Sequence, residues 1–296
     1  MSAIELTNLT KNYGKSRGVI DVSLKVETGM VMGFLGPNGA GKSTTINMLV
    51  DLIRPTSGQI KLLGLDSRRD SVAIRRRVGF LAGDFALDME LTAWQQLEYF
   101  GNLHGRFNRV YVQQLAKRLD CDLGRKFKSL SRGNRQKVGL ISALMHEPEL
   151  LIFDEPTSGL DPLMQAEFNK IMMECRAQGK TIFVSSHALN EVQALCDHVA
   201  FIREGRLIAV KQLEELNDAT TKNIRVTTKD TKLLAALAKL PGVKVQNRAN
   251  TFTEFTSTGD INAVLALLAK HKVQDVTINE ADLETTFMQY YEDANV

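Results

Sequence analysis

A glycine-rich stretch at 36–44, GPNGAGKST, fits the pattern GxxxxGK[ST]. It follows a continuous apolar run at 30–36 and opens a helical pattern from Lys42 to about Ile53. In this context backbone N–H groups surround phosphate oxygens, Lys42 reaches the β- and γ-phosphates, and Ser43 offers its hydroxyl to Mg²⁺. A turn that only joins a strand to a helix is the alternative interpretation. The residues predicted to bind the nucleotide phosphates are Gly36, Pro37, Asn38, Gly39, Ala40, Gly41, Lys42, Ser43 and Thr44.

Two carboxylates follow a second apolar run, LLIFD at 150–154. Asp154 ends that run, so its side chain emerges at the carboxyl end of a buried strand, where ligands bind in open α/β sheets. An aspartate there can hold the Mg²⁺ that Ser43 contacts, and Glu155 can polarise a water molecule against the γ-phosphate. The alternative is a pair of carboxylates without a chemical role, which the phosphate-binding loop disfavours.

His187 follows a further segment predicted to be a buried strand, TIFVSS at 181–186, in the same way. A lone histidine at a strand end is more often structural. Because it shares the carboxyl edge with Asp154 and Glu155, we interpret it as a contact to the γ-phosphate that helps to orient the water.

A further anion site is indicated by LSRGNRQ at 130–136, which offers a hydroxyl, a glycine and two cations where a helix begins. Ser131 is expected to cap that helix. The chain already has one complete phosphate-binding loop, so these residues form a second, incomplete site.

These motifs require an α/β core with a helical insertion. Strand patterns alternate with helical ones over the first 216 residues, and residues from about 84 to 146 read as helices. A capping box at Thr92 and Gln95 and a cap at Asn108 begin two of these helices. VAFIREGRLIAV at 199–210 is expected to close the core as a hairpin.

A polar segment near 211–222 is expected to lead into a second domain, 217–296. Its patterns follow the order β-α-β-β-α-β, which indicates a small ferredoxin-like α+β fold. A last helix, ADLETTFMQYYED, places Leu283, Phe287 and Tyr290 or Tyr291 on one face, which favours docking over a cofactor site.

The 296 residues include 37 basic and 34 acidic side chains, a formal net charge of +3. This balance does not favour nucleic-acid binding, and the basic spots at 68–69 and 75–77 are interpreted as solvated helix surface. Cys121, Cys175 and Cys196 form no CxxC or zinc pattern, so reduced thiols of a cytosolic protein are expected. The sequence shows neither a signal peptide nor an apolar run of membrane-spanning length, so we expect a cytoplasmic chain.

The motifs GPNGAGKST, LSRGNRQ, LLIFDEPTSGLD and VSSH occur in the order and at the spacings of an ABC transporter ATP-binding subunit, which the chain resembles over essentially its whole length. The segment ending INEADLETTFMQYY is similar to the accessory domain of drug- and natural-product-export ATPases of the ABC-2 type. The resemblance implies an ATPase subunit that uses ATP and Mg²⁺ and drives export by ATP-dependent dimerisation. It also implies transmembrane permease partners of the ABC-2 type and a place on the inner face of the cell membrane.

The resemblance gives the second anion site a role. It implies that Ser131 and Gly133 contact the γ-phosphate of ATP bound to a partner chain, and that Asp161, in the SGLD loop, lies at this interface. Two chains arranged head to tail, as a homodimer or a heterodimer, then complete two sites. Tyr13 is implied to stack on adenine; taken alone, it is equally well a partly buried strand residue. For Ser131, the alternative to contacting a partner chain's ATP is a role as a helix cap alone.

The chain departs from the family pattern at two places. Gly83 stands where the family usually has a glutamine that contacts Mg²⁺ and water, and whether Asp84 replaces that glutamine is open. Arg132 and Asn134 stand where glycine and glutamine are commonest.

A soluble ABC ATPase that remodels ribosomes or DNA is the rival function. Such proteins usually carry two ATPase units or an inserted coiled coil, and the sequence has neither. A P-loop kinase or GTPase conflicts with the LSRGNRQ motif and with His187.

Overall fold

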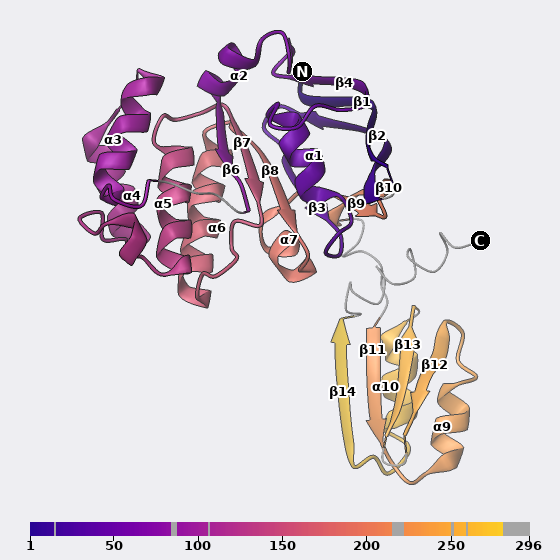
Figure 1. Cartoon of the computed structure of the whole chain (residues 1–296). Coiled ribbons are helices and arrows are strands. Elements are labelled where there is room, and N and C mark those ends of the chain that lie inside the picture. Colours follow the sequence, from indigo (N-terminus) through magenta and orange to yellow (C-terminus); the bar gives the residue numbers. More distant parts are fainter. Residues whose placement is uncertain are drawn as a thin grey trace. The chain divides into compact units, whose positions relative to one another are not determined.

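The computed structural model describes residues 1–14, 16–83, 88–105, 107–214, 222–249, 252–258 and 260–280 (Figure 1). The chain divides into two compact units, Met1–Gln212 and Leu213–Val296. The domain boundary expected at 216 stays a prediction, because residues 215–221 lie outside the described ones.

A six-stranded sheet forms the centre of the first unit, with the order β10-β9-β3-β8-β7-β6. Its neighbouring strands are parallel, except that β9 and β10 form the predicted antiparallel hairpin. β3, β7 and β8 are buried along their whole length, which explains the apolar runs of β3 and β7 and the apolar centre of β8. The strands are β3 (Val31–Leu35), β6 (Val78–Leu81), β7 (Leu150–Asp154), β8 (Thr181–Ser186), β9 (His198–Arg203) and β10 (Arg206–Gln212).

A second, antiparallel sheet has the order β2-β1-β4-β5. One core cluster joins the two sheets, and helix α1 contributes Ile46, Met48 and Leu49 to it. α1 ends at Leu49, earlier than the predicted Ile53, because the chain turns at Asp51, which has a left-handed φ of 55°. The elements are β1 (Ser2–Tyr13), β2 (Ser16–Glu27), α1 (Lys42–Leu49), β4 (Ser57–Leu62), β5 (Leu65–Asp66) and α2 (Ser71–Arg77).

Helices α3, α4 and α5 gather on one side of the first unit (Figure 1). All three predicted caps are confirmed, because the side chains of Thr92, Asn108 and Ser131 accept hydrogen bonds from backbone N–H groups in the first turns. One expectation was wrong: Arg68 and Arg69 lie in a turn ahead of α2, where their N–H groups bind the Asp66 carboxylate. The remaining helices are α3 (Ala93–His104), α4 (Arg109–Arg118), η1 (Phe127–Ser129), α5 (Arg132–Leu144), α6 (Pro162–Ala177) and α7 (Leu189–Leu195).

The second unit contains a four-stranded antiparallel sheet with the order β12-β13-β11-β14. Its elements follow one another as β-α-β-β-α-β, and a separate core lies between the sheet and the two helices. The ferredoxin-like assignment stays an interpretation, and the predicted helix with Leu283 and Phe287 lies outside the described residues. The elements are β11 (Lys222–Thr227), α9 (Thr231–Leu237), β12 (Val243–Arg248), β13 (Thr253–Ser257), α10 (Ile261–Leu268) and β14 (Asp275–Glu280).

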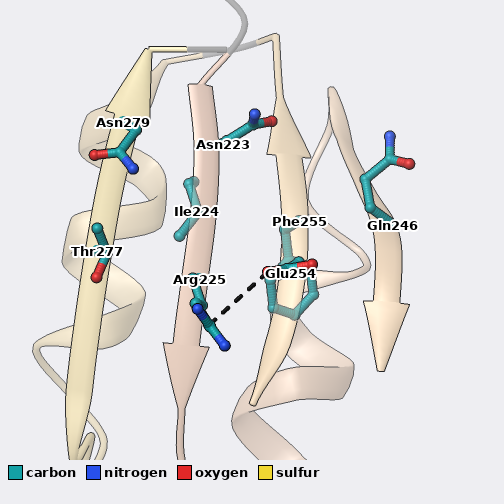
Figure 2. Close-up of a pocket in the computed structure, with 8 residues that line it drawn as sticks. All are labelled: Asn223, Ile224, Arg225, Gln246, Glu254, Phe255, Thr277 and Asn279. Carbon is teal, nitrogen blue, oxygen red and sulfur yellow. Dashed lines mark ion pairs between the residues drawn. The ribbon is translucent and has the colours of Figure 1, made fainter. Parts of the chain in front are cut away.

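The face of this sheet opposite the helices is polar (Figure 2). A pocket of about 450 Å³ lies on it, lined by side chains that include Asn223, Arg225 and Asn279. Arg225 Nε lies 3.8 Å from Glu254 Oε1, a loose ion pair between exposed groups.

His146 is a buried titratable group of the first unit. Its Nε2 lies 3.1 Å from the carbonyl oxygen of Val78, and its ring stacks on His104 with the centroids 4.2 Å apart. Burial is the main cause that lowers the pKa of His146 to about 4, and the neighbouring His104 adds to it. The folded state therefore holds a neutral ring at pH values where the unfolded chain binds a proton.

We expect folding stability to fall as the pH drops from about 6.5 toward 4, because only the unfolded state takes up this proton. The loss attributable to His146 is on the order of 2–3 kcal/mol. His146→Gln keeps a donor for Val78 O but does not titrate. Chemical denaturation at pH 7 and pH 4.5 measures the effect: the variant should lose less stability than the wild type. An equal loss in both proteins would contradict this assignment.

Candidate functional site

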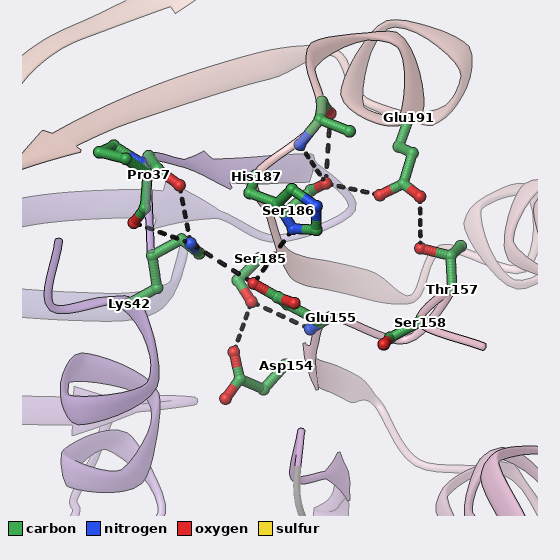
Figure 3. Close-up of polar contacts among 12 residues, drawn as sticks. Pro37, Lys42, Asp154, Glu155, Thr157, Ser158, Ser185, Ser186, His187 and Glu191 are labelled. Atoms are coloured by element: carbon green, nitrogen blue, oxygen red, sulfur yellow. Dashed lines mark hydrogen bonds and ion pairs between the residues drawn. The ribbon is translucent and has the colours of Figure 1, made fainter. Parts of the chain in front are cut away.

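Four of the predicted site residues lie close together at the carboxyl edge of the six-stranded sheet: Lys42, Asp154, Glu155 and His187 (Figure 3). β8 lies between β3 and β7 and is parallel to both. The glycine-rich loop leaves β3, Asp154 ends β7 and His187 follows β8. The parallel register places these three strand ends side by side, as the sequence predicted.

Lys42 is held beneath the glycine-rich loop. Gly41 precedes α1 with a φ of 106°, a conformation that favours glycine. The buried Lys42 ammonium donates to the carbonyl oxygens of Gly36 at 2.7 Å and Pro37 at 3.2 Å. It also lies 3.4 Å from Glu155 Oε1. The ammonium thus stands at the open N-terminus of α1, where unpaired N–H groups also favour an anion.

Ser185 connects the Asp154 carboxylate to the backbone of Glu155. Its hydroxyl donates to Asp154 Oδ1 at 2.6 Å and accepts from the Glu155 N–H at 3.1 Å. Glu155 has a left-handed φ of 48°, an uncommon conformation for a residue other than glycine. Such conformations persist where the surroundings enforce them, and they cluster at functional sites.

His187 lies beside Glu155. Its Nδ1 lies 3.4 Å from Glu155 Oε1, and its side chain is 55% exposed, so it stands at the rim of the site. Glu155 therefore contacts both Lys42 and His187 within one chain. The sequence predicted that Glu155 and His187 share a sheet edge, but it did not predict these contacts.

A cavity of about 440 Å³ opens beside these residues. Ser43, Asp154 and Glu155 line it together with Gly83. A Cβ atom on Gly83 would lie 3.2 Å from Asp154 Oδ2, so the glycine lies directly against that carboxylate. Asp84 lies outside the described residues.

The donors at this cavity fit Mg²⁺. Among the described residues no group of three His, Cys, Asp or Glu side chains could hold a metal by itself. Mg²⁺ in nucleotide sites is typically bound by one or two protein groups, by substrate phosphates and by water. Asp154 and the Ser43 hydroxyl, both lining the cavity, supply such a small set.

The start of α5 contacts the loop that follows Glu155. A Cβ atom on Gly133 would lie 2.5 Å from the carbonyl oxygen of Gly159, so only glycine allows this approach. Arg132 Nη2 donates to Ser158 Oγ at 3.2 Å, and Gln136 Nε2 donates to the carbonyl oxygen of Pro156 at 3.0 Å. The motif at 130–136 thus lies against the loop that carries Asp161.

Ser131 is exposed, and its hydroxyl accepts from the Asn134 N–H. Asp161 accepts from the Met164 N–H and caps α6. In the part of the chain that the structure describes, no hydrogen bond or ion pair joins Ser131 or Gly133 to the loop at 36–44. Both cap contacts are compatible with either interpretation of the second anion site.

Tyr13 lies at the end of β1 and is 42% exposed, so its ring is accessible to a ligand. Lys11 Nζ lies 5.1 Å from the ring centroid. Gln136, Ser185 and Glu191 were missed by the sequence analysis although they contact the site. Gln136 and Ser185 lie within the quoted motifs LSRGNRQ and VSSH, whereas Glu191 lies outside all of them. The partners of all three residues lie on other elements.

Comparisons with known proteins agree with this geometry. The family profile described as ABC transporter matches residues 19–158. The chain is 37% identical over 227 residues to the ABC transporter ATP-binding protein NatA of Bacillus subtilis (strain 168), covering 73% of this chain and 92% of NatA. It is 38% identical over 247 residues to the daunorubicin resistance ATP-binding protein DrrA3 of Streptomyces coeruleorubidus, covering 81% of this chain and 78% of that protein.

Among solved structures, a dimeric bacterial ABC transporter cassette is similar with a TM-score of 0.66 at 25% identity, covering 71% of this chain and 98% of the cassette. The fold and the site thus define an ATP-binding cassette. The chain belongs to the family of ABC transporter ATP-binding proteins. The predicted α/β cassette fold, the binding of ATP and the ATPase class are confirmed. The relatives do not favour a soluble ABC ATPase outside transport.

Proposed function

We propose that this chain is the ATP-hydrolysing subunit of an exporter of the ABC-2 type. The contact of Glu155 with both Lys42 and His187 carries this proposal, because it brings a candidate base, a phosphate-binding cation and a histidine together at the carboxyl edge of the sheet. The similarity to a daunorubicin resistance ATP-binding protein supports export. No helix in the described part of the chain could cross a membrane. Permease subunits would then hold the chain at the inner face of the cell membrane.

The roles of the site residues follow from their contacts. Lys42 has three N–H donors, of which two bind loop carbonyls and the third faces Glu155. A γ-phosphate that takes this third donor leaves Glu155 free to accept a proton from water. His187 then contacts the same phosphate, and Tyr13 stacks on adenine. Asp154 and Ser43 would hold Mg²⁺, and the bound ion would supply neutralisation of phosphate charge.

A second chain is proposed to complete each site. Ser131 lies exposed at the start of α5, where it could meet the γ-phosphate of a partner chain's ATP, with Gly133 and Asp161 close to the interface. The dimeric cassette of similar fold supports this arrangement. The partner is a second copy or a similar chain.

Affinity purification of the tagged chain from detergent-solubilised membranes tests the proposed function. We expect integral membrane subunits to be retained and the purified complex to hydrolyse ATP. Recovery of ribosomal proteins or DNA, with no membrane protein, would contradict it.

Removal of the second unit should leave ATP binding about unchanged, because all of the site residues lie within Met1–Gln212 and the second unit has its own core. Titration of a chain ending at residue 216 with a fluorescent ATP analogue, beside the full chain, measures this. Loss of binding in a truncated chain with a cooperative thermal transition would show that the second unit contributes to the site.

A further inference from the structure

Glu191 joins the two loops that carry Glu155 and His187 (Figure 3). It lies in the first turn of α7, four residues after His187. Its Oε1 accepts a hydrogen bond from the Thr157 hydroxyl at 2.7 Å, and its Oε2 accepts one from the Ser186 hydroxyl at 2.5 Å. One carboxylate therefore bridges β7's exit loop and β8's exit loop.

Both donors are buried and close to the reacting groups. Thr157 is 7% exposed and lies two residues after Glu155, while Ser186 is 2% exposed and directly precedes His187. Hydrogen bonds from hydroxyls to a carboxylate are short and about twice as strong as neutral ones. The Ser186 hydroxyl also accepts from the Ala188 N–H at 2.9 Å, which connects both sides of His187 to the bridge.

The Glu191 bridge is positioned to hold the contact between His187 and Glu155, which is not fixed by packing around the His187 ring. His187 is 55% exposed, and its Nδ1 approaches Glu155 Oε1 at 3.4 Å. A half-exposed ring depends on its backbone for position, and the backbone on each side of His187 is tied to Glu191. A displacement of about 1 Å at such a site can cost on the order of 100-fold in rate.

We propose that Glu191 is a positioning residue for ATP hydrolysis, which acts through Thr157 and Ser186 to keep His187 and Glu155 in register. This inference rests on the proposed roles of Glu155 and His187. Glu191 itself need not touch the nucleotide. The competing role is structural: a carboxylate that only satisfies two buried hydroxyls.

Steady-state ATPase kinetics of the full chain separate the two roles. We expect Glu191→Ala to lower kcat about 10-fold or more while KM for ATP changes less than about 2-fold. Glu191→Gln, which keeps one acceptor oxygen, should retain an intermediate kcat. Gln193→Ala, an exposed position on α7, serves as the matched control and should behave as wild type.

A double-mutant cycle measured on kcat distinguishes a positioning role from a purely structural one. If Glu191 acts through Thr157, Glu191→Ala combined with Thr157→Val should lower kcat no further than Glu191→Ala alone. The inference would be overturned if the losses of kcat in the double mutant were additive. It would also be overturned if Glu191→Ala kept a kcat within about 2-fold of wild type, or if it lost ATP binding and thermal stability in parallel with kcat. If Glu191→Ala does not fold, a wild-type kcat in Glu191→Gln overturns it equally. An inactive wild-type chain would instead refute the proposed function.

Discussion

Lys42→Met should lower ATP turnover by about 100-fold or more, the effect expected when a cation aimed at transition-state charge is removed. The methionine side chain keeps the apolar length of lysine, so the buried stem still packs, but the carbonyl oxygens of Gly36 and Pro37 lose their donor. Glu155 also loses its ion pair. The remaining negative charge would then face the triphosphate, so ATP binding should weaken as well.

Turnover and the Kd of a fluorescent ATP analogue measure both effects. Lys61→Met is the matched control, because Lys61 is an exposed lysine on β4, away from the nucleotide loop. Equal turnover in Lys42→Met and Lys61→Met would remove Lys42 from the site.

Glu155→Gln should lower turnover by about 100-fold or more while ATP binding persists. Glutamine keeps the shape of glutamate and an oxygen for Lys42, but it cannot accept the proton of the attacking water. The chain would then bind ATP without cleaving it, and the ATP-bound dimer should accumulate.

Single-turnover hydrolysis and size-exclusion chromatography with ATP test this together. Glu204→Gln is a suitable control, because Glu204 is also a glutamate with a left-handed φ, 50°, but lies in the exposed turn between β9 and β10. Wild-type turnover in Glu155→Gln would assign the base to another group.

The sequence predicted those site residues that stand at the carboxyl end of a buried strand. The segments at 150–154 and 181–186 coincide with β7 and β8, because each has an apolar stretch typical of a buried parallel strand, with polar residues at its carboxyl end. The side chains of Asp154, Glu155 and His187 then share one edge by topology. Helix caps were predictable for a similar reason: they depend on residues within one turn.

Features that depend on distant partners were not predictable. The end of α1 at Leu49 is a local exception: it depends on the left-handed backbone at Asp51, which the apolar pattern did not reveal. In the sequence, nothing distinguishes Glu191 from other polar residues in a helix. Its carboxylate accepts hydrogen bonds from hydroxyls on two other segments. Ser185 reads as part of a strand, yet it holds Asp154. Such contacts arise only when the sheet has assembled.

The sharing of each ATP between two chains is tested most directly by the oligomeric state of Ser131 variants in the Glu155→Gln background. Aspartate and asparagine both cap helices as well as serine does, so α5 should begin normally in either variant. Only Ser131→Asp places a negative charge opposite the partner's γ-phosphate. In sedimentation velocity with ATP and Mg²⁺, Glu155→Gln and its Ser131→Asn derivative should be dimers. The Ser131→Asp derivative should stay monomeric while still binding ATP. A dimer of that derivative as stable as its parent would contradict the shared site.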